Sequence, residues 1–267
     1  MKNFFKLIQQ EVSAGRPVSL VSVVAVKGSA PQRVGAKMLV SSSGKLLWGT
    51  IGGGTVESLA LKQAKIQIDI KTPLLKSFEL VESGEEATGM LCGGEMKLFI
   101  DIFGISTKVY LFGAGHITQQ IIPLLMNLGF SPIIIDDRED YLKENIVTRL
   151  NVVTHTGDFV DIIDSLFIEE DSYIIIMTYS HDVDEKILYH LLSQKLLNLS
   201  TVKYLGMIGS MRKVKEIFSR LESKGISREI LNSIHSPIGV PIKSQTPEEI
   251  AISIAAELIS VRNKEDK

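Results

Sequence analysis

Short apolar runs alternate with longer amphipathic segments in the second part of the chain. Each apolar run is about as long as one buried strand, and each amphipathic segment is long enough for a helix. This alternation is typical of a parallel sheet with helices on its faces. The predicted strands are 108–112, 132–136, 150–154, 173–177 and 202–206, and the predicted helices are 116–128, 158–165, 183–193 and 211–222.

The first part of the chain has a different pattern. Predicted strands follow one another at 18–26, 36–40, 45–48, 74–80 and 96–102, with helices only at the N-terminus and at 55–67. The pattern changes after Phe103 and Gly104, so we place a domain boundary there. We predict an α/β protein with a smaller N-terminal α+β domain (1–104) and a doubly wound, Rossmann-like domain (105–267).

A last helix is predicted after Thr246. Thr246 suits the N-cap, Pro247 the first helical position, and Glu249 completes a capping box. Ile250, Ile254 and Leu258 then recur at four-residue spacing, which gives the helix one apolar face.

The composition argues against several classes of protein. The 267 residues carry a formal charge of −2, which argues against a strongly basic nucleic-acid binder. No apolar run approaches the roughly 18 residues that indicate a membrane span. The single cysteine, Cys92, excludes an internal disulfide and a zinc site of several cysteines. We therefore expect a soluble protein of a reducing compartment, the cytoplasm, without a nucleic-acid or membrane partner.

A glycine-rich turn follows the first strand of the predicted Rossmann-like domain. Gly113 permits a tight turn, and Gly115 lets a phosphate approach the amides of the helix that begins at His116. Thr118 stands where the dinucleotide motif has its third glycine. The next strand ends at Asp136 and, two residues later, Arg138, and these suit a sugar and a phosphate respectively. Either nucleotide binding or a turn retained without a ligand fits this pattern.

Two further segments of the N-terminal domain carry candidate chemistry. The run Gly52–Gly53–Gly54 directly precedes a helix and marks either a close ligand or a sharp, tightly packed bend. Glu57, one turn into this helix, either contacts a ligand or complements the helix dipole. Cys92 lies in a predicted loop before two glycines and is either an accessible thiol or an inert small side chain.

Polar residues also follow the later strands of the second domain. His181 comes after the strand at 173–177, and Ser210 comes after the strand at 202–206. His181 could bind a metal, move a proton or, together with Asp182, cap its helix. Ser210 is a natural N-cap. Because Gly113, His181 and Ser210 all follow strands of one parallel sheet, we expect them to meet at its carboxyl edge, where such sheets bind ligands.

Taken together, these segments resemble the xanthine dehydrogenase accessory factor family, XdhC/CoxI. The resemblance covers most of the chain, and its weight comes from the order and number of individually weak motifs. Tyr179 stands where members frequently carry histidine. The motifs are Gly28-Ser29-Ala30-Pro31, Gly35-Ala36-Lys37-Met38, Gly49-Thr50-Ile51-Gly52-Gly53-Gly54 with Glu57, Cys92-Gly93-Gly94, Gly113-Ala114-Gly115-His116, Asp136-Asp137-Arg138, Ser180-His181-Asp182-Val183-Asp184, Gly206-Met207-Ile208-Gly209-Ser210 and Ser236-Pro237-Ile238-Gly239.

The resemblance implies a chaperone that binds the molybdenum cofactor, as molybdopterin or its dinucleotide form, and helps to sulfurate it and insert it into a xanthine dehydrogenase-type hydroxylase. The implied partners are the apo molybdenum hydroxylase and a cysteine desulfurase. Cys92 would contact the molybdenum, because soft thiolates suit such a centre. The implied cofactor-binding residues are Gly52, Gly53, Gly54, Glu57, Cys92, Gly113, Gly115, His116, Asp136, Arg138, His181 and Ser210.

Two other functions stay open at this stage. An NAD(P)-dependent oxidoreductase, or a nucleotide-sensing module, would use the same turn at Gly113–Gly115. A Rossmann-like fold does not by itself specify which of these functions it serves. We also expect a homodimer, with strand 18–26 and helix 250–259 as candidate contact surfaces.

Overall fold

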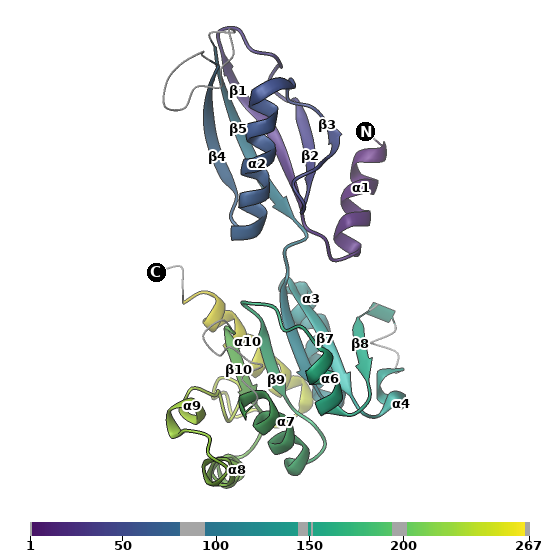
Figure 1. The fold of residues 1–267 in the computed structure, drawn as a ribbon. Helices are drawn as coiled ribbons and strands as arrows, with labels where there is room; N and C mark the ends of the chain where they lie inside the picture. Colours follow the sequence, from purple (N-terminus) through teal and green to yellow (C-terminus); the bar gives the residue numbers. More distant parts are fainter. Residues whose placement is uncertain (1, 81–93, 144–148, 151, 194–201, 265–267) are drawn as a thin grey trace. The chain divides into compact units, whose positions relative to one another are not determined.

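The computed structural model describes residues 2–80, 94–143, 149–150, 152–193 and 202–264 (Figure 1). The chain divides into two compact units, Met1–Ile105 and Ser106–Lys267. Each unit is considered by itself.

The N-terminal unit is a five-stranded antiparallel sheet with two helices. The sheet order is β3-β2-β1-β5-β4, and every neighbouring pair is antiparallel. The strands form at the predicted places and, among the described residues, only two helices accompany them (Figure 1). Their bounds are α1 Lys2–Ser13, β1 Val18–Lys27, β2 Lys37–Ser41, β3 Leu46–Gly49, α2 Gly54–Ile70, β4 Leu74–Leu80 and β5 Gly94–Phe103.

Alternation along β1 explains why both faces of this sheet are covered. Val21 and Val23 lie in the core cluster that includes Val56 and Ala60 of α2. Val18 points the other way and packs with Phe4 of α1. Because side chains alternate along a strand, one central strand serves two cores.

The C-terminal unit is a parallel sheet in the Rossmann order. The strands run β10-β9-β6-β7-β8, and all four neighbouring pairs are parallel. The order therefore reverses between β6 and β9, which is the topological switch point of the sheet. The bounds are β6 Thr107–Phe112, α3 His116–Asn127, β7 Phe130–Asp136, α4 Glu139–Leu142, β8 Val153–Thr156, α6 Phe159–Ser165, β9 Tyr173–Ile176, α7 His181–Ser193, β10 Tyr204–Met207, α8 Met211–Ser223, α9 Arg228–Asn232 and α10 Pro247–Arg262.

Helices cover both faces of this sheet, so it is doubly wound, as predicted. Val109 and Leu111 of β6 face the cluster that holds α3 and α10. Tyr110 and Phe112 face the cluster that holds α6, α7 and α8. The continuous apolar runs in the sequence follow from this burial on two sides.

The C-terminal tail attaches α10 to the sheet. His235 pairs with β10 through its own amide and carbonyl, at 2.9 Å to Leu205 and 3.0 Å to Met207. Glu257 of α10 accepts hydrogen bonds from Tyr204 Oη at 2.5 Å and from the Gly239 amide at 2.7 Å. The predicted capping box of Thr246 and Glu249 is present and sets where α10 begins.

The start of one predicted strand needs correction, and the two segments proposed as dimer contacts have partners within the chain. β8 begins at Val153 rather than residue 150, because Leu150 and Val152 pack against the core outside the strand. The segments proposed for self-association are used within the chain: β1 lies between β2 and β5, and α10 packs on α3. Packing within the chain explains their apolar character, and the homodimer stays a prediction.

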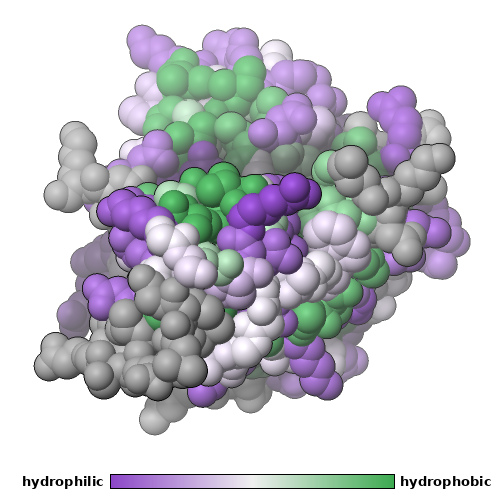
Figure 2. Space-filling model, turned by 90° about the horizontal axis from the view of Figure 1, so that it is seen from above, coloured by the Kyte–Doolittle hydropathy of each residue, from purple (hydrophilic) through white to green (hydrophobic). Residues whose placement is uncertain are grey.

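Apolar and polar residues are interspersed on the surface seen in Figure 2. Among the described residues, no helix is both long enough and apolar enough to cross a bilayer.

Candidate functional site

The glycine turn after β6 is shaped by its contact with β9. Gly113 donates its amide to Ile135 O at 2.8 Å and has a φ of 111°. A Cβ at this position would lie 2.3 Å from Met177 O. Gly113 is therefore required both by its backbone conformation and by the close approach of the neighbouring strand.

Gly115 and His116 open the N-terminus of α3. Gly115 is the N-cap, and no side chain caps the helix. A Cβ on Gly115 would meet nothing within 4 Å, and His116 is exposed. The first amides of a helix lack intrahelical partners and carry the positive end of its dipole, so this end suits an anion.

Thr118 stands at the position of the motif's third glycine, and its side chain makes a hydrogen bond to the glycine turn. Its side chain is buried, and its Oγ1 donates to Gly113 O at 2.5 Å. The hydroxyl thus holds the first turn of α3 against the glycine turn.

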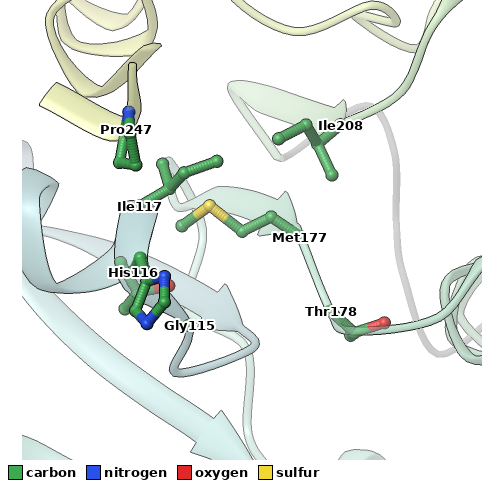
Figure 3. Close-up of a pocket in the computed structure, with 8 residues that line it drawn as sticks. Gly115, His116, Ile117, Met177, Thr178, Ile208 and Pro247 are labelled. Carbon is green, nitrogen blue, oxygen red and sulfur yellow. The ribbon is translucent and has the colours of Figure 1, made fainter. Parts of the chain in front are cut away.

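A cavity of about 290 Å³ lies beside this helix end, at the switch point of the sheet (Figure 3). Its walls come from the turn after β6, from the ends of β9 and β10, and from the start of α10. The cavity combines mostly apolar side chains with the helix end. The lining residues are Gly115, His116, Ile117, Thr118, Met177, Thr178, Ile208 and Pro247.

A second hollow of about 180 Å³ adjoins the first. It shares Gly115, His116, Met177 and Thr178 with the larger cavity and adds Arg138, Tyr141 and Tyr179. The two hollows together form the candidate site of the C-terminal unit.

Asp136 does not face this site, contrary to the expectation from the sequence. Its side chain is fully buried and accepts hydrogen bonds from the Ala114 amide at 2.6 Å and from Arg138 Nε and Nη2 at 2.8 Å. Burial disfavours the charged carboxylate, but these hydrogen bonds outweigh it and lower the pKa of Asp136. The carboxylate therefore holds the glycine turn and Arg138 in place and presents no free oxygen to a sugar.

His181 and Ser210 line neither hollow. His181 is the exposed first residue of α7, where Ser180 Oγ accepts from the Asp182 amide at 3.3 Å. Ser210 is the N-cap of α8 and accepts from the Lys213 amide at 3.3 Å. Their geometry is that of helix starts, and only their neighbours Thr178 and Ile208 reach the cavity.

A buried ion pair lies directly behind those two neighbours. Lys213 Nζ donates to Asp184 Oδ2 at 2.5 Å and to Ile208 O at 3.0 Å. Asp184 Oδ1 accepts from the Thr178 amide at 2.9 Å and from Thr178 Oγ1 at 2.6 Å. The pair thus joins α7, α8 and the cavity wall, a role that no pattern in the sequence indicates.

The glycine motifs of the N-terminal unit meet at one place. A Cβ on Gly52 would lie 2.6 Å from Pro31 Cβ, and a Cβ on Gly94 would lie 2.1 Å from Ser29 O. Gly52, Gly53 and Gly54 all have positive φ values. The segment 28–31 is therefore in close contact with both the triple glycine and the start of β5.

Glu57 holds the triple-glycine turn from within. Its Oε2 accepts from Thr50 Oγ1 at 2.5 Å and from the Ile51 and Gly53 amides at 3.1 Å. Burial opposes ionisation, but these hydrogen bonds lower the pKa of Glu57. The carboxylate stabilises a turn whose Gly53 faces open space.

Cys92, the predicted molybdenum contact, lies outside the described residues. In the described part of the chain, no three His, Cys, Asp or Glu side chains are grouped so that they could hold a metal ion.

Several residues that line the site were not predicted to belong to it. Met177 and Thr178 follow β9 and could have been found from the rule that ligands bind beyond the carboxyl ends of parallel strands. Ile208 follows β10 and obeys the same rule. Pro247 is distant in sequence from the other lining residues, and only the packing of α10 on α3 brings it there.

Two family models match the chain. The model described as the XdhC Rossmann domain matches residues 109–258. The model described as the XdhC and CoxI family matches residues 12–78.

Three curated relatives are similar to this chain. The Escherichia coli protein called YqeB is 32% identical over 92% of the chain and 44% of its own length. A Bacillus subtilis protein, named as a probable subunit of xanthine dehydrogenase, is 26% identical over 63% of the chain and 47% of its own length. The molybdenum cofactor insertion chaperone PaoD of Escherichia coli is 21% identical over 98% of the chain and 88% of its own length.

The chain spans about half the length of the first two relatives. A crystal structure from Bacillus halodurans, described as a xanthine dehydrogenase, matches with a TM-score of 0.53 and 19% identity. It covers 97% of this chain and 96% of its own, and it supports the fold.

Proposed function

Because this chain belongs to the XdhC family, we propose that it binds the molybdenum cofactor and delivers it to a molybdenum hydroxylase. A cavity at the switch point of a Rossmann-order sheet, beside a helix end without a side-chain cap, is the observation that carries this proposal. Similarity to a protein named as a molybdenum cofactor insertion chaperone supports it.

The two parts of a phosphorylated pterin match two parts of this site. The amides at the start of α3 and the dipole of that helix suit the phosphate. Ile117, Met177 and Ile208 offer apolar contacts for a planar ring system. Gly113 keeps the turn close to β9, so that the amides and the apolar wall stand beside each other.

The finer steps are also part of the proposal. An apo molybdenum hydroxylase of the xanthine dehydrogenase type would receive the cofactor, and a cysteine desulfurase would supply sulfur before insertion. Cys92 would contribute a soft thiolate to the molybdenum. We place the protein in the cytoplasm and expect it to act as a homodimer.

An oxidoreductase using NAD(P) is the second candidate, favoured by the glycine turn at Gly113–Gly115. The buried state of Asp136 weighs against it, because that carboxylate is the expected ribose contact.

Cofactor retention tests the proposal. The pure protein would be incubated anaerobically with molybdenum cofactor and desalted, and the bound pterin would be oxidised to its fluorescent derivative and quantified. We expect near-stoichiometric pterin and activation of an apo-hydroxylase by the loaded protein. In parallel, NAD(P)H would be titrated. Tight NAD(P)H binding without pterin retention would overturn the proposal in favour of the oxidoreductase.

The same assay tests the thiolate. Cys92→Ser should reduce retention and client activation, whereas Lys215→Ala, at an exposed position of α8 that lines neither hollow, should not. Normal retention and normal client activation by Cys92→Ser would exclude the metal contact.

A further inference from the structure

A bridge of side chains crosses above the end of β6. Tyr179, which follows β9, donates its hydroxyl to Asp137 Oδ2 at 2.8 Å, and Asp137 follows β7. Because β6 lies between β9 and β7 in the sheet, the bridge spans the strand that leads into the glycine turn. The ends of β7 and β9 are roughly 10 Å apart at ordinary strand spacing, so only a long side chain can close this gap.

Arg138 packs against the tyrosine of this bridge. Its guanidinium carbon lies 3.9 Å from the ring centroid of Tyr141 and 4.5 Å from that of Tyr179. Its Nε and Nη2 both donate to Asp136. The guanidinium is thus held between two rings while it neutralises the buried carboxylate, so the whole assembly is preorganised.

This assembly lies at the end of β7, where Rossmann domains that bind dinucleotides hold a nucleoside. In Rossmann domains that bind dinucleotides, the acidic residue ending the second strand accepts hydrogen bonds from ribose. Here that residue is Asp136, fully buried and already bonded to Ala114 and Arg138. Tyr179 and Arg138 line the smaller hollow on that side.

The opposite side remains open to a smaller ligand. The lining of the larger cavity extends from Gly115 to Ile208 and Pro247 (Figure 3), and Arg138 is not part of it. The volume of this cavity is about 290 Å³ and that of the adjoining hollow about 180 Å³, and each lies below the usual range for small-molecule pockets. One ring system with a single phosphate suits this space better than a dinucleotide.

We propose, on the basis of the function proposed above, that the bridge of Tyr179, Asp137 and Arg138 selects molybdopterin with one phosphate over its dinucleotide forms. Tyr179 is the specificity-determining residue. It is half-exposed, so its replacement removes the bridge without opening the core.

Competitive loading tests this selection. Wild type and variants would be offered equal amounts of molybdopterin and its cytosine dinucleotide form, then desalted, and the two oxidised derivatives would be separated by chromatography. We expect wild type to prefer the single-phosphate form by roughly tenfold, the effect of losing one hydrogen bond and one cation–π contact. Tyr179→Ala should bring the ratio close to one. Tyr179→Phe keeps the ring and loses the hydroxyl, and its ratio should fall between the two.

A second measurement does not depend on the pterin. Wild type should bind NADH weakly in a fluorescence titration, and Tyr179→Ala should bind it more tightly. An equal ratio of the two pterin forms in wild type, an unchanged ratio in Tyr179→Ala, or tight NADH binding by wild type would overturn the selection while leaving pterin binding intact. Retention of neither pterin form by wild type would instead overturn the proposed function, and the selection with it.

Discussion

Gly113 and Gly115 occupy the same turn but meet different constraints. Gly113 has a φ of 111°, and a Cβ there would collide with Met177 O. Gly115 has a φ of −68° and open space around it. The first is therefore needed by the fold, and the second is compatible with any small side chain.

We predict that Gly113→Ala destabilises the C-terminal unit and abolishes pterin retention. A non-glycine residue held at positive φ costs about 1–3 kcal/mol, and the clash with β9 adds to this. Urea unfolding followed by circular dichroism would measure the loss. Gly115→Ala is the matched control: it adds no steric clash, and because alanine is a poorer N-cap than glycine it should cost only about 1 kcal/mol, less than Gly113→Ala. Equal effects of the two substitutions would show that steric contact with β9 does not shape the turn.

The sequence predicts the positions of these residues better than their roles. The glycine turn, the helix beginning at His116 and the carboxylate ending β7 all lie where the motif places them. The direction in which Asp136 points was not predictable, because it depends on Arg138 folding back over two tyrosines. Local spacing predicts where a side chain begins, whereas its partners depend on packing between distant segments.

At the scale of elements, the periodic pattern was sufficient for most helices and strands. Two-sided burial gave continuous apolar runs, and the capping residues marked the start of α10. β8 was less well placed, because Leu150 and Val152 are apolar for reasons of packing and not of strand pairing. The buried ion pair that joins α7 and α8 could not be predicted, since Asp184 and Lys213 look like surface charges in the sequence.

We predict that the ion pair of Asp184 and Lys213 is a main stabilising contact behind the cavity wall at Thr178 and Ile208. Lys213→Met leaves Asp184 buried without its cation and should cost about 3–5 kcal/mol. The double variant Asp184→Asn, Lys213→Met should recover part of that loss, because asparagine can still accept the hydrogen bond from Thr178. Lys215→Met, at an exposed position of the same helix, is the control. A double-mutant cycle in urea measures the coupling, and purely additive effects would contradict it.

At the scale of the whole molecule, the chain keeps its hydrophobic cores apart. Two apolar clusters are built entirely from residues before position 105, and two entirely from residues after it. The pattern of apolar residues changes near residue 104, which is also where the residues of the first two clusters end and those of the other two begin. Within the part of the chain that the structure describes, each cluster draws its residues from one unit, so each unit has the means to fold cooperatively.

We therefore predict that the two units unfold independently, and Trp48 allows this to be measured in the intact chain. It is the only tryptophan of the sequence, and its ring centroid lies 5.0 Å from that of Phe4 in the N-terminal unit. Its fluorescence thus reports on that unit, whereas circular dichroism reports on both. Lys213→Met should lower the urea midpoint of the C-terminal unit and leave the Trp48 midpoint unchanged. A parallel shift of the Trp48 transition would mean that the units unfold as one, despite their separate cores.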